Sequence, residues 1–417
     1  MSSPVSTLVL SFEDARHVVE HHAALLHDRG KELVDLLDAA GQVLAEPVFA
    51  DRNFPPFSRA TRDGYTVRAA DFANQSANLQ VVGEIKAGAA ETGVKLEAGQ
   101  AAAIMTGAPV PNGADAVVMV EYTSRVAGRV EISRAATAGE NIVPAGAEAK
   151  RGERLLSPGM RLTPAAIAVA ASAGKSRILV YSKPRVAVLA TGDELVDIDV
   201  PPAIHQIRNS NSYSLAAQIQ AGGGEAILLP IAPDAPDRLR ELILDGLDAD
   251  LLLITGGVSM GKYDLVEQVL TDLNAEFFFT GAKIQPGRPV VFGRMPWESA
   301  ETKQGFKYFF GLPGNPVSTM VTYELFARPI QQALSGMLPQ NLIWLRARLK
   351  SEIKIKPGLR RFLPAVLSGE FERAEVELVP WQGSGDISAT ARANCYAVIP
   401  PDRDHIPAGE WIPALSR

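Results

Sequence analysis

The chain of 417 residues contains a single cysteine, Cys395. One cysteine excludes an intramolecular disulfide framework and a cysteine-based zinc cluster, and it fits a reducing compartment. The N-terminal residues lack the basic, apolar and small-residue segments of a secretory signal, and no apolar run reaches the roughly 18 residues of a membrane-spanning helix. We therefore expect a soluble, cytoplasmic protein with no membrane partner.

Positive charge is not in excess either. The chain has 41 Lys and Arg residues against 47 Asp and Glu residues, so its formal net charge is −6 at pH 7. No basic stripe stands out, which argues against a nucleic-acid partner. The length provides ample material for a hydrophobic core and for about two to four domains.

The stretch around which the chain is organised runs from Leu251 to Leu265, LLLITGGVSMGKYDL. Its first four residues form a short apolar run that is typical of a strand buried on both faces, and apolar residues at helical spacing begin at Val266. Between them, Gly256 and Gly257 allow positive φ and the close approach of a ligand. The pattern predicts a strand, a ligand-binding loop and a helix.

The same loop matches G-x-x-x-x-G-K, the phosphate-binding motif of many NTPases. The next residue is Tyr263, however, where that motif requires a Ser or Thr hydroxyl for magnesium. We therefore interpret the loop as an anion-binding turn, in which Asp264 is either a ligand residue or the N-cap of the following helix.

Apolar strands alternate with helical patterns from residue 184 to residue 335, which predicts a doubly wound parallel sheet. Three loops follow directly on strands: Thr191–Glu194, Thr255–Asp264 and Gly311–Ser318. Ligands of open α/β sheets bind outside the carboxyl ends of the strands, so we expect these loops to line one edge.

Acidic side chains accompany the glycines in two of these loops. Asp193, Glu194 and Asp264 are hard oxygen ligands of the type that magnesium takes, which favours a phosphate-bearing ligand held through a divalent metal. Asp193 and Glu194 are also compatible with helix caps.

The segments on either side of this region have different patterns of apolar and turn residues. Short β-type runs separated by turns predict an all-β domain within residues 48–148, and similar runs follow residue 342. Capping and apolar patterns predict helices over residues 11–26 and 163–173, and a further helix over Leu33–Leu44. The predicted domains are residues 1–47 with 149–183 (helical), 48–148 (inserted β), 184–335 (α/β, substrate binding) and 336–417 (C-terminal β).

Three smaller features have competing interpretations. SRATRDGY at Ser58–Tyr65 and MTGAPVP at Met105–Pro111 suggest a chemical role, but ordinary surface turns have the same composition. His17 and His21 stand one helical turn apart. Because no third ligand type accompanies them, a solvated helix face is a simpler interpretation than a metal site.

Seven motifs, taken in order, closely resemble those of the molybdopterin molybdenumtransferases, the MoeA family, which is related to the E domain of gephyrin. Each motif is weak alone, but the ordered set is specific and spans nearly the whole chain. The motifs are DGY (Asp63–Tyr65), MTGAPVPNGADAVV (Met105–Val118), TGDEL (Thr191–Leu195), TGGVSMGKYD (Thr255–Asp264), PGRP (Pro286–Pro289), GLPGNPVS (Gly311–Ser318) and QGSG (Gln382–Gly385).

The resemblance implies the last step of molybdenum cofactor synthesis. In this step adenylylated molybdopterin and molybdate react, with a divalent metal that we take to be Mg²⁺, to give the cofactor and AMP. The resemblance also implies an elongated homodimer with a MogA-like α/β domain, a C-terminal β-barrel-like domain and a site completed in part by the second subunit. A MogA-type adenylyltransferase and recipient molybdoenzymes are the implied protein partners.

Carried over position by position, the resemblance also implies roles for individual residues. Metal-bound carboxylates would neutralise phosphate charge, while an arginine and a hydroxyl would bind the oxyanion. The implied catalytic residues are Asp63, Glu194, Asp264, Arg288 and Ser384, and the implied metal ligands are Asp193, Glu194 and Asp264. The implied residues of the substrate-binding surface are Thr106, Gly192, Gly256, Gly257, Ser259, Lys283, Pro286, Gly287, Pro313, Gly314, Asn315, Pro316 and Arg360.

The chain departs from the family at two positions near the expected oxyanion. The family commonly has KPGKP where this chain has QPGRP, so Gln285 replaces a lysine, and Lys283 on the same strand face is the expected substitute. An arginine that the family uses near molybdate aligns with Pro364. Arg360, four residues back on the same face, is its expected substitute.

Two other functions are compatible with parts of the chain. The α/β domain alone suggests an adenylyltransferase that acts one step earlier, but the two extra β domains argue against it. A non-catalytic scaffold like gephyrin is the other alternative, and the retained acidic positions argue against that one.

Overall fold

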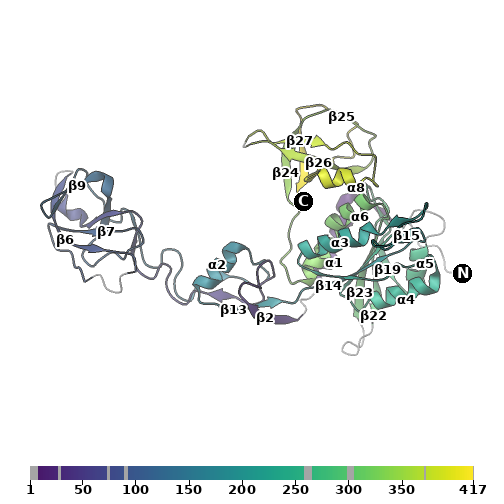
Figure 1. Ribbon diagram of the computed structural model, residues 1–417, viewed down its shortest axis with the longest axis horizontal. Coiled ribbons are helices and arrows are strands. Elements are labelled where there is room, and N and C mark those ends of the chain that lie inside the picture. Colours follow the sequence, from purple (N-terminus) through teal and green to yellow (C-terminus); the bar gives the residue numbers. More distant parts are fainter. Residues whose placement is uncertain are drawn as a thin grey trace.

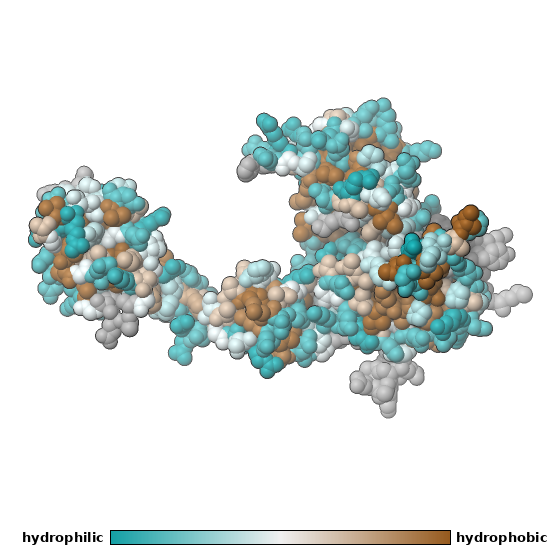
Figure 2. Space-filling view, viewed as in Figure 1, coloured by the Kyte–Doolittle hydropathy of each residue, from teal (hydrophilic) through white to brown (hydrophobic). Residues whose placement is uncertain are grey.

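The computed structural model describes residues 8–26, 30–72, 76–88, 93–257, 265–297, 305–370 and 372–416. These residues form an elongated molecule (Figure 1). A β sheet containing β6, β7 and β9 lies at one end, a small unit with α2, β2 and β13 lies in the middle, and the α/β unit with the C-terminal β unit lies at the other end. Figure 2 shows the open concave side between the first β unit and the C-terminal unit.

The α/β unit is built on a six-stranded sheet whose outer edge differs from the prediction. The first four strands are parallel, as predicted, but β19 and β22 are joined antiparallel at one edge. The described residues 280–290 between β19 and β22 contain no helix, so these two strands can pair antiparallel without a crossover. In order across the sheet, the strands are β17 (Glu225–Leu228), β14 (Arg185–Ala190), β18 (Leu251–Thr255), β23 (Gly305–Leu312), β22 (Val291–Trp297) and β19 (Glu276–Phe279).

Helices cover both faces of this sheet, which explains the near-continuous apolar sequence of its strands. Within β14, Val186 and Val188 belong to the core on one face, while Ala187 and Leu189 belong to the core on the other. The helices of the first face are α1 (Phe12–Ala24), α3 (Ser210–Ala221), α6 (Pro316–Thr322), the π-helical turn η3 (Tyr323–Ala327) and α7 (Arg328–Leu334); those of the second are α4 (Pro236–Gly246) and α5 (Leu265–Asp272).

The first helix packs on the α/β unit. Phe12, Ala15 and Val19 are buried in the same core as Phe326 and Ile330. Helix α1 begins where the capping signal predicts, because Ser11 Oγ accepts a hydrogen bond from the backbone N–H of Asp14 at 3.0 Å. Helix α1 therefore belongs to the α/β unit, whereas the other predicted helix, α2 (Pro164–Ser172), belongs to the middle unit (Figure 1).

The helix predicted over Leu33–Leu44 is wrong. Residues Lys31–Asp35 form β2, which pairs antiparallel with β13 (Arg177–Tyr181), and turns follow up to Gly41, whose φ is +78°. Leu37 is 82 % exposed, so the apolar spacing that suggested a helix face does not correspond to a buried face. Strand pairing with a distant segment overrides local helical propensity here.

The inserted β segment forms a second six-stranded sheet, built from the short β-type runs that the sequence predicts. Its order is β8 (Ala116–Met119), β5 (Gly64–Val67), β7 (Gln100–Ile104), β6 (Ala77–Ile85), β10 (Arg129–Ile132) and β9 (Thr123–Val126). The short strands β3 (Val48–Phe49) and β4 (Arg59–Ala60), which precede this sheet in the chain, pair antiparallel with β12 (Arg154–Leu156) and β11 (Ile142–Val143), which follow it.

The C-terminal segment forms a closed five-stranded barrel. Its strands follow the order β26 (Arg360–Ser368), β27 (Glu375–Leu378), β24 (Trp344–Leu349), β30 (Trp411–Ser416) and β28 (Cys395–Ile399), and β28 pairs back onto β26. Strand β21 (Ile284–Gln285), which comes from the α/β segment, adds to the barrel parallel to β26. The PGRP loop that follows β21 is therefore fixed to the barrel as well as to the α/β unit.

No helix in the described part of the chain is long and apolar enough to span a membrane. The predicted combination of a MogA-like α/β unit with β-rich units is confirmed.

Candidate functional site

A cavity of about 660 Å³ lies at the carboxyl ends of β14, β18 and β23. All three predicted loops contribute to it, together with residues before α3 and near α8 (Ile387–Arg392). The lining residues are Thr191, Glu194, Leu195, Ile207, Arg208, Asn209, Ser210, Asn211, Thr255, Gly256, Gly257, Pro289, Pro313, Gly314, Asn315, Pro316, Gly385 and Ile387. The position agrees with the rule that open α/β sheets bind ligands where the strand order reverses, here between β14 and β18.

The glycines at this edge allow the loops to approach one another closely. Gly256 has φ +93°, and a Cβ atom on it would lie 2.3 Å from the carbonyl oxygen of Thr191. A Cβ on Gly314 would lie 3.5 Å from the Cα of Gly256, so the loops after β18 and β23 are in contact. Backbone is consequently exposed to the cavity in a way that larger residues would prevent.

Asn211, which the sequence reasoning missed, joins the loops. Its Nδ2 donates to Thr255 Oγ1 at 3.0 Å and to the Gly314 carbonyl oxygen at 2.7 Å. Its Oδ1 is enclosed and has no hydrogen-bond partner among the described residues. The signal in the sequence was the polar stretch RNSNS at Arg208–Ser212, in which Asn209 caps α3.

The acidic residues of the TGDE loop point to different partners. Glu194 lines the cavity, and its carboxylate lies against Gly192, where a Cβ would come within 2.5 Å of Glu194 Oε2. Asp193 Oδ1 instead accepts the backbone N–H of Asp234 at 3.0 Å and does not line the cavity. Asp264, like Ser259, lies outside the described residues.

The donor set of the cavity is compatible with magnesium. In the described ranges no group of three or more His, Cys, Asp and Glu side chains is arranged to hold a metal ion by itself. Mg²⁺ commonly takes only one or two protein carboxylates and completes its shell with substrate phosphates and water. Among the described carboxylates, Glu194 lines the cavity and could bind Mg²⁺ together with substrate phosphates. Asp193 instead accepts a hydrogen bond from the backbone N–H of Asp234.

The PGRP loop borders the cavity through Pro289. Pro286 and Gly287 are buried, and Gly287, with φ +104°, packs so closely on α6 that a Cβ would lie 2.4 Å from Thr322 Cγ2. Lys283 and Arg288 are exposed and do not line the cavity. Arg288 thus faces solvent directly beside the cavity-lining Pro289, whereas Lys283 faces solvent before β21.

The C-terminal barrel closes the cavity on the side of the QGSG turn. The carbonyl oxygen of Ser384 accepts the backbone N–H of Val317 at 3.0 Å, which attaches this turn to the start of α6. Gly385 and Ile387 line the cavity directly, whereas the half-buried Ser384 does not.

Arg360 faces the first helix of the chain. Its guanidinium forms an ion pair with Glu13, and it lies over the ring of Phe12 at 5.5 Å from the centroid. Pro364 is buried further along β26. The charge of Arg360, the expected substitute for the family's arginine, is therefore compensated within the chain.

Asp63 and Thr106 lie next to strands β5 and β7 of the inserted sheet, and this sheet is at the opposite end of the molecule from the α/β unit (Figure 1). Asp63 Oδ1 accepts hydrogen bonds from the Thr106 backbone N–H at 2.6 Å and from Thr106 Oγ1 at 2.9 Å. These two bonds, the backbone one foremost, lower the pKa of the exposed Asp63 carboxyl. A single chain does not bring this pair together with Glu194.

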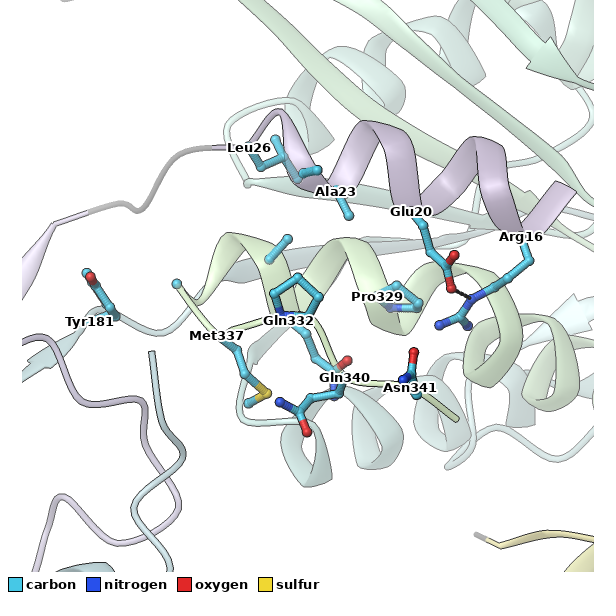
Figure 3. A pocket seen from close by; sticks show the side chains of 14 residues that line it. Arg16, Glu20, Ala23, Leu26, Tyr181, Pro329, Gln332, Met337, Gln340 and Asn341 are labelled. Atoms are coloured by element: carbon cyan, nitrogen blue, oxygen red, sulfur yellow. Dashed lines mark hydrogen bonds and ion pairs between the residues drawn. The ribbon is translucent and has the colours of Figure 1, made fainter. Parts of the chain in front are cut away.

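A second cavity, of about 610 Å³, lies between α1, α7 and the segment after α7 (Figure 3). The guanidinium of Arg16, which lines this cavity, already has hydrogen-bond partners within the protein. Arg16 Nε donates to Glu20 at 2.7 Å, and Arg16 Nη1 donates to the Leu325 carbonyl oxygen at 2.6 Å. None of the loops that carry the motifs lines it. The cavity at the sheet edge, which the motif-bearing loops line, is therefore the better candidate for the functional site.

The predicted histidine face has a mixed outcome. His17 and His21 are exposed, as expected of a solvated face, but His22 stacks on Phe278 with 3.8 Å between ring centroids. Burial lowers the pKa of His22, which favours the neutral imidazole in this aromatic environment.

Comparison with known protein families gives three consecutive matches along the chain. The models described as MoeA N-terminal region (domain I and II), probable molybdopterin binding domain, and MoeA C-terminal region (domain IV) match residues 10–174, 187–333 and 346–416.

Individual relatives match over nearly their whole length. A molybdopterin molybdenumtransferase from Nostoc sp. is 35 % identical, over 92 % of this chain and 88 % of its own. One from Haemophilus influenzae is 32 % identical, over 91 % of this chain and 92 % of its own. The crystal structure of a MoeA molybdopterin biosynthesis protein from Pyrococcus horikoshii is 31 % identical and superimposes with a TM-score of 0.70, covering 98 % of this chain and 99 % of the other. Because the three MoeA models match in order along most of the chain and relatives above 30 % identity cover nine-tenths of it, the chain belongs to the MoeA family of molybdopterin molybdenumtransferases.

Proposed function

We propose that this chain transfers molybdenum from molybdate to adenylylated molybdopterin, giving the molybdenum cofactor and releasing AMP. The observation that carries the proposal is the cavity at the sheet edge, because three glycine-containing loops and Glu194 meet there at the carboxyl ends of parallel strands. Exposed backbone at such an edge suits the phosphates of a nucleotide-linked substrate.

The described residues suit the parts of this reaction. The contact between Gly256 and Gly314 leaves loop backbone open to the phosphates, and the side chain of Asn211, which lines the cavity, holds the two loops in place around it. Glu194 would hold Mg²⁺ together with the phosphates, and the metal would supply charge neutralisation at the phosphoanhydride. The exposed cations Arg288, which adjoins the cavity-lining Pro289, and Lys283 would attract molybdate as a dianion.

The proposal includes a homodimer. Asp63 and Thr106 lie far from Glu194 within one chain, so a site that uses all three takes the first two from a second copy. A symmetric dimer would form two such sites. We further propose that the protein works in the cytoplasm, receives its substrate from a MogA-type adenylyltransferase and passes its product to molybdoenzymes.

The test is an assay of the purified protein with adenylylated molybdopterin, magnesium and molybdate. AMP release is followed together with reconstitution of a cofactor-free molybdoenzyme. We expect both signals to require molybdate, and we expect Glu194→Gln to reduce them by at least about a hundredfold, because it removes a charge at the phosphates. Glu225→Gln, at the exposed start of β17, is the matched control and should behave as wild type.

Two results would overturn the proposal. Adenylylation of molybdopterin from ATP would place the chain one step earlier. AMP release that proceeds equally without molybdate, and never yields active cofactor, would identify a nucleotide hydrolase instead.

A further inference from the structure

The cavity between α1, α7 and the segment after α7 has no role in the proposed reaction. Its volume of about 610 Å³ is typical of small-molecule sites, which occur preferentially where domains meet. Arg16 and Met337 of its lining are buried, whereas Pro339 and Gln340 are exposed, so the cavity extends from the interior to solvent. A small molecule could therefore enter it.

The cavity lies at a joint between units of the molecule. Helices α1 and α7 belong to the α/β unit, Tyr181 belongs to β13 of the middle unit, and the segment after α7 leads to β24 of the barrel. Gly336, with φ +70°, packs so closely on Tyr181 that a Cβ would lie 2.4 Å from Cδ2 of the ring. The N–H of Leu338 donates to the carbonyl oxygen of Gly159, which precedes α2, at 3.0 Å. These contacts hold the walls of the cavity in place.

One part of the lining is apolar. Figure 3 shows Ala23 and Leu26 of α1 across the cavity from Met337, with the ring of Tyr181 at one end. Burial of apolar surface against such walls favours binding of a ligand whose body is apolar.

Side-chain amides form a second part of the lining. Gln332, Gln340 and Asn341 lie near one another in Figure 3, and Gln332 is half-buried. Gln340 Nε2 donates to the Leu338 carbonyl oxygen at 3.0 Å. Gln332 and Asn341 form no hydrogen bond with another residue drawn in Figure 3. Because an amide has a donor beside an acceptor, these two suit a ligand edge that also has a donor beside an acceptor.

The charges of the lining are paired. Arg16 and Glu20 are its charged residues, and Arg16 Nε donates to Glu20 Oε1 at 2.7 Å (Figure 3). An ionic ligand would lose water on entry and would find no unpaired opposite charge among the lining residues. The cavity therefore favours a neutral ligand.

We propose that this cavity is a binding site for a neutral molecule with an apolar body and an amide-type edge, the chemistry that nucleobases and pterins share. The apolar walls would bind the body, and Gln332 and Asn341 would bind the edge. The proposal is independent of the proposed function, because no residue that lines the cavity at the sheet edge lines this one.

Hydrogen exchange measured by mass spectrometry tests the proposal, with guanosine and neopterin as the added probes. Both are neutral near neutral pH and carry the amide-type edge. We expect at least one of them to slow exchange, in a saturable manner, in the peptide that covers residues 333–342. Protection by one probe alone would identify a nucleobase or a pterin as the ligand. GMP, which adds a phosphate to guanosine, should not protect at lower concentrations than guanosine does.

Two variants test whether this protection comes from the cavity. Gln332→Leu removes the half-buried amide at similar size, and it should raise the concentration for half-maximal protection by about fivefold or more. Gln268→Leu, at an exposed position of α5, is its matched control and should behave as wild type. Ala333→Phe keeps the amides but fills the cavity, so it should abolish protection even if Gln332→Leu folds poorly. Ala168→Phe, at an exposed position of α2, is the control for added size.

Three results would count against the proposal. Protection of residues 333–342 by neither probe would overturn it. Protection of both cavity variants at the wild-type concentration would place the bound probe elsewhere and would overturn it as well. Tighter binding of GMP than of guanosine in this cavity would overturn the assignment of a neutral ligand. Loss of molybdate-dependent AMP release, with exchange as expected, would instead count only against the proposed function.

Discussion

The side-chain amide of Asn211 donates a hydrogen bond to the carbonyl oxygen of Gly314 at 2.7 Å. The same Nδ2 also donates to Thr255 Oγ1. A single residue at the start of α3 thus fixes the relative position of the loops that follow two adjacent parallel strands, β18 and β23. The shape of the cavity between these loops depends on this amide.

Replacement of Asn211 by alanine should loosen the two loops. Each lost hydrogen bond is worth about 1 kcal/mol, so we expect the KM for adenylylated molybdopterin to rise by roughly 10- to 30-fold. Steady-state AMP release measures this effect. Gln220→Ala, on the exposed face of the same helix, should leave the KM unchanged. An Asn211→Ala enzyme with wild-type KM would show that the loops hold their positions without the amide.

Gly256 should tolerate no side chain. Gly256→Ala places a Cβ 2.3 Å from the backbone oxygen of Thr191 at φ +93°, so backbone must shift. Gly139→Ala is the matched control, because Gly139 has φ +85° but open space around its Cβ position. We expect the control to lose about 1 kcal/mol of unfolding free energy from the strained φ alone, and Gly256→Ala to lose about 2–4 kcal/mol, measured by denaturant unfolding. Equal losses would mean that the loop after β18 adapts freely.

The sequence predicted the α/β unit well because its signals are local. Continuous apolar runs such as Leu251–Ile254 indicate buried strands wherever their partners lie, and the glycines after them marked the cavity edge correctly. The antiparallel edge of β19 and β22 was not predicted, because strand direction depends on the connection between strands rather than on the residues in them.

Tertiary partners decided the features that the sequence could not show. Leu33 lies in a strand because Leu179 of β13 pairs with it, over a hundred residues away in the chain. Asp193 and Glu194 are both carboxylates, so the sequence alone cannot choose between them as metal ligands. In the structure Asp193 accepts a hydrogen bond from the backbone N–H of Asp234.

The carboxyl of Asp63 should titrate below the usual range of aspartate. The Thr106 backbone N–H and then the Thr106 hydroxyl lower its pKa. Thr106→Val removes only the hydroxyl, so the pKa of Asp63 should rise part of the way toward its ordinary value. NMR titration of the carboxyl carbon measures the shift. Thr123→Val, which removes the Thr123 hydroxyl bonded to the Val120 carbonyl oxygen in the same sheet, should leave the Asp63 pKa unchanged.

The sign of the pH dependence follows from the same shift. Because the folded-state pKa of Asp63 lies below that of the unfolded chain, its carboxylate stabilises the folded loop at pH values above the ordinary aspartate pKa. This contribution disappears as the pH falls through the folded-state pKa. In Thr106→Val the loss should therefore occur at a higher pH than in the wild type. A midpoint at the same pH in both proteins would contradict the assignment of the shift to Thr106.

Two inactive variants should restore each other if the site is shared between chains. Asp63→Asn and Glu194→Gln alter residues that lie far apart in one molecule. In a mixed dimer, one site would contain both substitutions and the other neither. Random exchange of subunits makes half of the dimers mixed, so AMP release should recover to about a quarter of the wild-type rate. The double variant Asp63→Asn, Glu194→Gln, mixed with wild type, is the control, because its mixed dimers carry one substitution in each site. Its rate should fall to about a quarter of the wild-type rate, since only pure wild-type dimers remain active. No recovery in the first mixture, once mass spectrometry shows that subunits have exchanged, would place Asp63 outside the site that contains Glu194.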